Sequence, residues 1–308
     1  MNERPRLAAI AGAVIGVQVG AALVATRFVV AETGPVSLAL MRYIVGVAIL
    51  LPIALAAAHR FAARGLGVRG WTRREWLMII GLGMVQFGVQ IASLNEGLKT
   101  VVAARAALIY TTTPFIALAI GALLGRERFT GPKLIGVVFT FAGVALALGE
   151  KVLETKTGAS GWRGEMLCFA AAALAAGCSV FYRATLGHLP ALTVGAWAMA
   201  ASFLFLVPIA AMEGFFTRVP TYSIAGWSAI VFIGASSALG YYLWLWALQN
   251  TTPTRVTAFL ALSPITAALL GVALLGESLS VGIVGGGVLI IAGLWLAHRD
   301  PARALRAS

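Results

Sequence analysis

Polar and aromatic side chains recur at helical spacing within stretches that are otherwise apolar. Gln86 and Gln90 are four residues apart, so one face of a helix carries both amides. Amides, hydroxyls and aromatic rings can hydrogen-bond a solute or stack on it without adding charge. We expect them to line a central cavity, formed by helices of both halves, that suits a neutral or zwitterionic amphipathic solute. The full set is Gln18, Gln86, Gln90, Tyr110, Thr113, Ser179, Tyr182, Ser237, Tyr241 and Trp244.

These side chains also have a structural interpretation. Buried amides such as Gln86 and Gln90 hydrogen-bond between membrane helices in many proteins. Tyr241 and Trp244 could instead belong to the aromatic belt at the membrane surface. We favour the cavity for the two glutamines and leave both interpretations open for the aromatic pair.

Three charged residues stand out against this neutral background. Arg42 lies inside an apolar stretch, where a charge is costly unless it is paired or hydrated. It could bind a carboxylate or tether neighbouring helices, and we favour the structural role. Glu127 and Glu277 fall at the ends of apolar stretches, and we interpret both as structural charges that cap or anchor loops.

The residues that carry enzymatic or metal chemistry are not grouped. Cys168 and Cys178 are ten residues apart in one stretch, which is about 15 Å along a helix and too far for a disulfide. His59, His188 and His298 lie near span ends, without a metal-ligand spacing to these cysteines. No nucleophile–base pair, metal set or phosphate loop is evident, so we expect no enzyme activity, no metal and no cofactor.

Composition places the chain in a membrane. Of its 308 residues, 60% are hydrophobic and 11% charged, and the mean hydropathy is +0.93. Long continuous apolar runs predict an all-α polytopic membrane protein and not an outer-membrane barrel. The net charge of +12 comes from arginines that flank these runs, so we expect the lipid bilayer and a small-molecule substrate as partners, and no nucleic acid.

Ten stretches are long and apolar enough to cross a bilayer, which takes roughly 20 residues. An even number of spans puts both termini on one side. Fifteen of the 23 Lys and Arg residues flank the spans on that side and seven on the other, which predicts that both termini are cytoplasmic. The expected spans are 8–30, 36–58, 77–95, 101–124, 131–149, 163–186, 190–212, 222–248, 253–275 and 281–298.

One pattern occurs twice, 150 residues apart. Arg27 and Pro52 also recur, as Arg183 and Pro208, at an offset of 156. We therefore divide the chain into two repeats, 1–150 and 151–308, of five spans each. An odd number of spans inverts the second repeat in the membrane, an architecture typical of secondary transporters. The first copy is Arg105, Pro114, Gly121, Leu124, Glu127, Gly136 and Gly143, and the second is Arg255, Pro264, Gly271, Leu274, Glu277, Gly286 and Gly293.

Glycines and prolines mark the segments that could move. Gly12, Gly16 and Gly20 form a smooth ridge on the first span, against which another helix can pack closely or slide. Pro114 and Pro264 lie at matching positions in spans 4 and 9, where each removes a backbone hydrogen bond and favours a kink. We interpret all five as gating or hinge positions, with static packing or a fixed bend as the alternative.

Five segments of the apolar stretches form a recognisable set. They are "LMRYIVGVAIL" with Arg42, "YTTTPFIAL", "LALSPITAALLG", "LLGE" at 274–277 and "GGGVLIIAGLWLA". Together with the ten spans and the inverted repeat, this set resembles the drug/metabolite transporter superfamily, in its ten-span EamA-type branch. The first repeat departs from the pattern, with Arg126 where the second has Gly276. The resemblance covers nearly the whole chain and implies a secondary transporter of the bacterial inner membrane.

Within that family the resemblance implies export of small metabolites, in particular amino acids, including aromatic ones, by alternating access. Two alternatives stay open: a multidrug exporter of cationic compounds, and an organic-phosphate or nucleotide-sugar carrier. The first needs a membrane-embedded carboxylate and the second a cluster of cations, and neither is evident. The coupling ion and the oligomeric state cannot be read from the sequence, although one chain that holds both repeats can work as a monomer.

Overall fold

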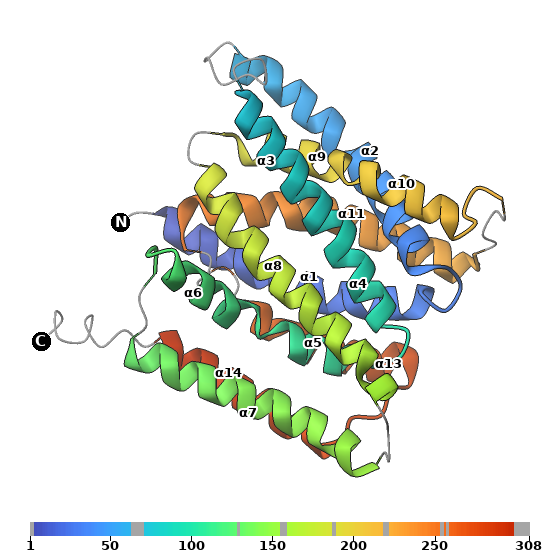
Figure 1. Cartoon of the computed structure of the whole chain (residues 1–308), viewed down its shortest axis with the longest axis vertical. Coiled ribbons are helices and arrows are strands. Elements are labelled where there is room, and N and C mark those ends of the chain that lie inside the picture. Colours follow the sequence, from blue (N-terminus) through green and yellow to red (C-terminus); the bar gives the residue numbers. More distant parts are fainter. Residues whose placement is uncertain are drawn as a thin grey trace, which may run out of the picture.

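The protein is a bundle of helices that pack against and across one another (Figure 1). The computed structural model describes residues 3–62, 71–127, 130–154, 159–186, 189–217, 222–252, 256 and 259–298. Within these ranges the regular structure is helical throughout, and no strand occurs. The all-α prediction is therefore confirmed for the part of the chain that the structure describes.

Some helices are continuous and others are broken within one stretch. The continuous ones are α1 (Glu3–Val29), α2 (Pro35–Ala62), α7 (Gly131–Glu154), α8 (Arg163–Thr185), α11 (Ile224–Asn250) and α14 (Val281–His298). The broken ones are α3 (Arg73–Gly83) with η2 (Met84–Val89) and α4 (Gln90–Gly97), α5 (Ala103–Tyr110) with α6 (Thr113–Leu123), α9 (Ala191–Ala201) with α10 (Phe203–Met212), and η4 (Phe259–Ala261) with α13 (Leu262–Leu275). A short 3-10 turn, η3 (Ala159–Trp162), precedes α8.

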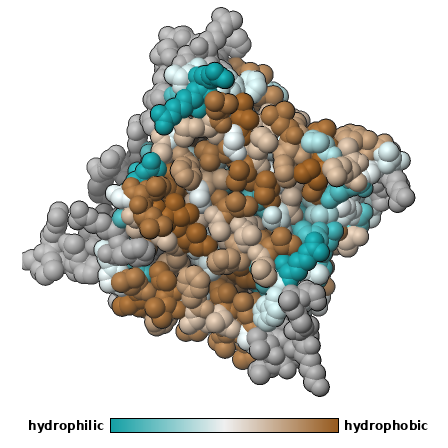
Figure 2. Space-filling model, in the orientation of Figure 1, coloured by the Kyte–Doolittle hydropathy of each residue, from teal (hydrophilic) through white to brown (hydrophobic). Residues whose placement is uncertain are grey.

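Eight of these stretches are long and apolar enough to cross a membrane. Two further apolar helices, Phe259–Leu275 and Val281–Gly293, are shorter. They coincide with the predicted spans 9 and 10, and residues 253–255 and 257–258, at the start of span 9, lie outside the described residues. Large apolar side chains such as Leu123, Ile224 and Val281 are more than four-fifths exposed. The face in Figure 2 is mostly hydrophobic, with hydrophilic side chains toward its edges, as expected of a surface in contact with lipid.

The two predicted hinge prolines lie just after breaks in their helices. The stretch that contains Pro114 is interrupted between α5 and α6, and the one that contains Pro264 changes from η4 to α13. Hydroxyls at matching positions satisfy carbonyls at each break: Thr113 donates to the Tyr110 carbonyl at 2.5 Å, and Ser263 to the Leu260 carbonyl at 2.6 Å. The breaks are therefore stable parts of the fold, since their freed polar groups have partners.

The glycine ridge of α1 faces η4 and α13. A Cβ atom on Gly16 would collide with the Phe259 carbonyl, and one on Gly20 would lie 2.5 Å from the Ser263 carbonyl oxygen. The Phe259 ring occupies the space that a Cβ atom on Gly12 would need. The close approach expected of the ridge is thus present, and its contact is the segment that carries Pro264.

The repeated glycines of α7 and α14 meet each other. A Cβ atom on Gly143 would lie 2.6 Å from the Gly286 carbonyl oxygen, and one on Gly293 would lie 3.0 Å from that of Gly136. The pair runs antiparallel, side by side along one edge of the bundle (Figure 1). These glycines allow two backbones to touch, which is how small residues join membrane helices.

The repeated glutamates fold back over the repeated glycines of the preceding helix. The Glu127 amide donates to the Gly121 carbonyl and the Glu277 amide to the Gly271 carbonyl, each at 3.1 Å. A Cβ atom on Gly271 would lie 2.7 Å from the Glu277 carboxylate, so the carboxylate packs directly over this glycine. Gly276 before Glu277 is left-handed, with φ at 63°, and in the first copy Gly125 has the same conformation at 67°.

Both glutamates anchor neighbouring segments in this fold. Glu277 accepts from the Ala103 amide at 3.2 Å and lies 3.6 Å from Arg27. Glu127 forms an ion pair with Lys133 at 3.5 Å. Of the repeated arginines, Arg105 lies 3.9 Å from Glu165, and Arg255 lies outside the described residues.

Candidate functional site: a polar cavity between the helices

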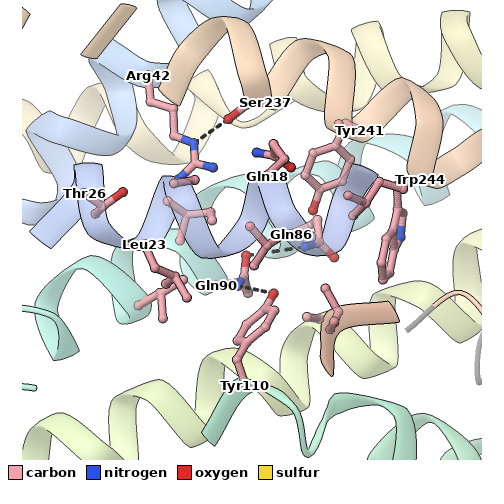
Figure 3. A pocket seen from close by; sticks show the side chains of 18 residues that line it. Gln18, Leu23, Thr26, Arg42, Gln86, Gln90, Tyr110, Ser237, Tyr241 and Trp244 are labelled. Atoms are coloured by element: carbon pink, nitrogen blue, oxygen red, sulfur yellow. Dashed lines mark hydrogen bonds between the residues drawn. The ribbon is translucent and has the colours of Figure 1, made fainter. Parts of the chain in front are cut away.

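A cavity of about 80 Å³ lies where α1, α2, the η2–α4 segment, α5, α8, α11 and η4 converge (Figure 3). Seven of the ten residues predicted to line a cavity do line this one. They are Gln18, Gln86, Gln90, Tyr110, Ser237, Tyr241 and Trp244. Apolar groups such as Ile15, Leu23, Ile91, Leu94 and Leu260 complete the wall.

The amides on one side of the cavity form a chain of hydrogen bonds. Gln86 Nε2 donates to Gln90 Oε1 at 3.4 Å, and Gln90 Nε2 donates to the Tyr110 hydroxyl at 3.0 Å. Gln90 is fully buried and Gln86 nearly so. Each glutamine thus has a protein partner, and the chain joins the η2–α4 segment to the end of α5.

A π-helical segment presents Gln86 to the cavity. Residues Met84–Val89 form η2, whose wider turn is closed by a bond from the Gln90 amide to the Val85 carbonyl. π-helical turns are rare and occur often at functional sites. The prediction that Gln86 and Gln90 share a face is confirmed by their contact, but the sequence pattern did not indicate the π-turn.

The α11 side of the cavity is aromatic. The Tyr241 ring packs on Phe87, with centroids 4.1 Å apart, and its hydroxyl is directed toward Gln86 in Figure 3. Trp244 lies one helical turn further along α11. The Gln18 side chain extends from α1 to α11, where its Nε2 donates to the Ser236 hydroxyl at 3.2 Å. It packs on Gly240, since a Cβ atom there would lie 2.5 Å from the Gln18 amide oxygen. Flat apolar rings beside amide groups suit a solute that has both kinds of surface.

Arg42 also lies on the cavity wall. It is 8% exposed, and its Nε donates to the Ser237 hydroxyl at 2.6 Å. Ser237 in turn donates to the Ile233 carbonyl. A structural Arg42 was expected to tether neighbouring helices, and its bond to Ser237 joins α2 to α11. Arg42 also lines the cavity.

Three predicted cavity residues lie away from the wall. Thr113 bonds to the Tyr110 carbonyl at the helix break, and Ser179 donates to the Ala175 carbonyl at 2.7 Å. Tyr182 is 1% exposed, and its hydroxyl has no hydrogen-bond partner among the described residues. Only Ala175 of α8 borders the cavity.

The repeat contains a signal for the lining residues that polarity alone does not reveal. At the 150-residue offset Gln90 corresponds to Gly240, Leu94 to Trp244 and Tyr110 to Leu260. All six of these residues line the cavity. Apolar Leu94 and Leu260 could therefore have been predicted from their polar or aromatic counterparts.

The chemistry available here is solute binding. No group of three or more His, Cys, Asp or Glu side chains that could hold a metal occurs within the described ranges. A cavity lined by amides, hydroxyls, aromatic rings and one arginine, inside a bundle of apolar, membrane-length helices, fits a polytopic membrane protein. The chain belongs to the EamA-like transporter family, whose sequence profile matches residues 6–149 and again residues 162–299.

Curated relatives of this chain are transporters. It is 28% identical, over 86% of its length and 88% of the relative's, to an uncharacterized transporter of Archaeoglobus fulgidus. A probable terminal-alkyne amino-acid exporter of Streptantibioticus cattleyicolor is 29% identical over 79% of this chain and 80% of its own. A probable amino-acid metabolite efflux pump of Salmonella typhimurium is 26% identical over 71% of this chain and 75% of its own.

The fold also has a solved counterpart. One crystal structure superposes with a TM-score of 0.72 over 97% of this chain and 98% of its own, at 20% sequence identity. At that identity the likeness concerns the fold alone.

Proposed function

We propose that this protein is a secondary transporter that exports amino acids, aromatic or other large neutral ones, by alternating access around the central cavity. The observation that carries the proposal is the cavity wall. It combines the amides of Gln18, Gln86 and Gln90 with the rings of Tyr241 and Trp244, inside the membrane-length bundle. The amides can hydrogen-bond the polar end of an amino acid, and the rings can stack on its side chain.

The proposal includes ten spans arranged as two inverted repeats, 1–150 and 151–308. The two matches to the family profile, one in each half, support this division. Equivalent contacts also recur: Arg27 donates to the Leu98 carbonyl, and Arg183 to the Leu248 carbonyl at 2.7 Å. These two contacts correspond through the offsets of 156 and 150.

The glycine contacts support the inversion itself. Gly143 meets Gly286, which is the counterpart of Gly136, and Gly136 meets Gly293, which is the counterpart of Gly143. Such reciprocal contacts are those of a two-fold axis. The axis relates two antiparallel helices and is therefore perpendicular to them, so in a membrane-spanning pair it lies in the membrane plane. That orientation is the one expected of an inverted-topology repeat.

The proposed setting is the bacterial inner membrane, with both termini in the cytoplasm and the single chain sufficient for transport. The bias of Lys and Arg supports this orientation. We propose no enzyme activity, since the cavity wall offers amides, hydroxyls, rings and one arginine and the family consists of transporters.

Counterflow in proteoliposomes tests the function directly. Vesicles that hold the purified chain are loaded with one unlabelled amino acid at a time, and entry of the labelled form is followed. We expect entry with phenylalanine, tyrosine or tryptophan and little with charged amino acids. Absence of counterflow with every amino acid, from protein that is folded and inserted, would rule out the proposal.

A matched pair of α11 variants locates the site. Tyr241→Ala removes a ring from the cavity wall, whereas Leu239→Ala shortens a side chain that is 58% exposed on the outer surface of the same helix. We expect counterflow to fall at least about tenfold in the first variant and to stay near the parent rate in the second.

A further inference from the structure

Arg42 is a buried charge at membrane depth. It lies seven residues into α2, which begins at Pro35, and therefore about 10 Å along the helix axis. Its partner Ser237 lies near the middle of α11. An ionised group in such a place is costly and is retained where it serves a function.

The guanidinium group has unused hydrogen-bonding capacity. Its Nε bonds to Ser237, and the Tyr43 ring centroid lies 5.8 Å from its central carbon. Neither terminal nitrogen has a hydrogen-bond acceptor or a carboxylate partner within the part of the chain that the structure describes. In Figure 3 these two nitrogens point away from Ser237, toward α1, and Arg42 is one of the residues that line the cavity. A buried cation with two free donor nitrogens, directed into a cavity, is an incomplete ion pair.

We propose that Arg42 binds the carboxylate of the transported solute and that this contact dominates recognition. Two parallel N–H···O bonds from the terminal nitrogens match the two oxygens of a carboxylate, while Ser237 holds the guanidinium plane through Nε. This proposal rests on the proposed function and narrows it. The substrates are solutes with one carboxylate and an apolar or aromatic body.

The opposite end of the solute meets a different environment. The cavity wall contains no acidic side chain among its described residues. An ammonium group would find only neutral acceptors, such as the Gln86 amide oxygen and the Tyr241 hydroxyl. Charged partners form the stronger hydrogen bonds, so the carboxylate contributes more to binding than the amine does. The same cation repels an organic cation, which distinguishes this site from that of a cationic drug exporter.

A set of compounds that share a phenyl ring and differ in which charged groups they have tests the proposal. Phenylalanine has both groups, phenylpyruvate and 3-phenylpropionate have only the carboxylate, and phenylalaninamide and phenethylamine have only the amine. Each is measured as a competitor of phenylalanine counterflow and, separately, as a stabiliser of the detergent-purified chain against heat. We expect the three carboxylates to bind about 10- to 100-fold more tightly than the two amines in both assays.

Variants of Arg42 connect this preference to one side chain. In Arg42→Gln the preference for carboxylates should disappear, and in Arg42→Lys it should be partly retained because the charge remains. Arg183→Gln is the matched control, since Arg183 bonds to the Leu248 carbonyl outside the cavity. This variant should prefer carboxylates over amines as strongly as the parent does. If the Gln variant does not fold, the parent's ranking of the five compounds still decides the question.

The outcomes separate the two proposals. Carboxylate-dependent stabilisation without any counterflow supports the role of Arg42 and contradicts the export of amino acids. Counterflow in which phenylalaninamide competes as well as phenylalanine supports export and overturns the role of Arg42. Tighter binding of phenethylamine than of phenylpyruvate also overturns it and favours a carrier of cations.

Discussion

At the scale of single residues, Gln90 connects the polar groups of the cavity. It accepts from Gln86 and donates to Tyr110, so one fully buried amide positions two groups that line the cavity. The sequence predicted both neighbours from spacing and polarity. It left open whether Gln90 uses its hydrogen bonds within the protein, because only the three-dimensional arrangement brings Tyr110 to it.

Replacing Gln90 with leucine should weaken substrate binding without unfolding the chain. Leucine fills a similar volume, and the change frees the Gln86 amide and the Tyr110 hydroxyl to rotate or bind water. We expect the KM of counterflow to rise about fivefold to tenfold, as for the loss of one or two hydrogen bonds. Ser93→Ala is the control, because Ser93 on the same helix bonds to the Val89 carbonyl and is not part of the cavity wall. An unchanged KM in the Gln90 variant would show that the hydrogen bonds among Gln86, Gln90 and Tyr110 only hold the helices together.

The role of Arg42 could not be decided from the sequence. Its place inside an apolar run identified it as unusual, and two roles were open. The contact with Ser237 supports the tether, and the position of the guanidinium on the cavity wall is the basis for the proposed carboxylate contact. Residue type could not separate the two, because one arginine has five donors and can serve both.

At the scale of elements, the positions of the helix breaks were only partly predictable. Pro114 and Pro264 indicated kinks, and the structure has a break just before each proline. The π-helical segment η2 contains no proline, and no sequence signal indicated it. Its counterpart α11 is continuous through the matching residues, so packing around the cavity, and not local sequence, decides the difference.

The contact between α1 and η4 gives a prediction at this scale. Gly16→Ala places a methyl group against the Phe259 carbonyl and should separate the two segments. Overpacking of this kind costs about 1–3 kcal/mol, so the Tm in detergent should fall by about 5 °C. Gly81→Ala is the same substitution in a helix where nothing lies within 4 Å of the new methyl group, and its Tm should be unchanged or slightly higher. Equal Tm values for both variants would contradict the close packing.

At the scale of the whole molecule, the two halves are related but do not contribute equally to the cavity. Ala22, Leu23 and Thr26 of α1 line the wall. At the 156-residue offset their counterparts are Cys178, Ser179 and Tyr182 of α8, which lie away from it. If transport exchanges the conformations of the two repeats, α8 must take the place of α1 at the cavity. The prediction that Ser179 and Tyr182 line a cavity would then hold for the opposite conformation.

The exchange can be followed with the two cysteines of the chain, which are both buried free thiols on α8. Cys178 corresponds to the lining residue Ala22, whereas Cys168 corresponds to Gly12, which packs on Phe259 away from the cavity. In a Cys168→Ala chain we expect N-ethylmaleimide to label Cys178 severalfold faster during substrate exchange than without substrate, since turnover populates the state in which water reaches α8. In the reciprocal Cys178→Ala chain, Cys168 should react slowly under both conditions, and mass spectrometry of the intact protein gives both rates. Faster labelling of Cys168, or a Cys178 rate that turnover leaves unchanged, would contradict exchange between the repeats and would favour a cavity that stays against α1.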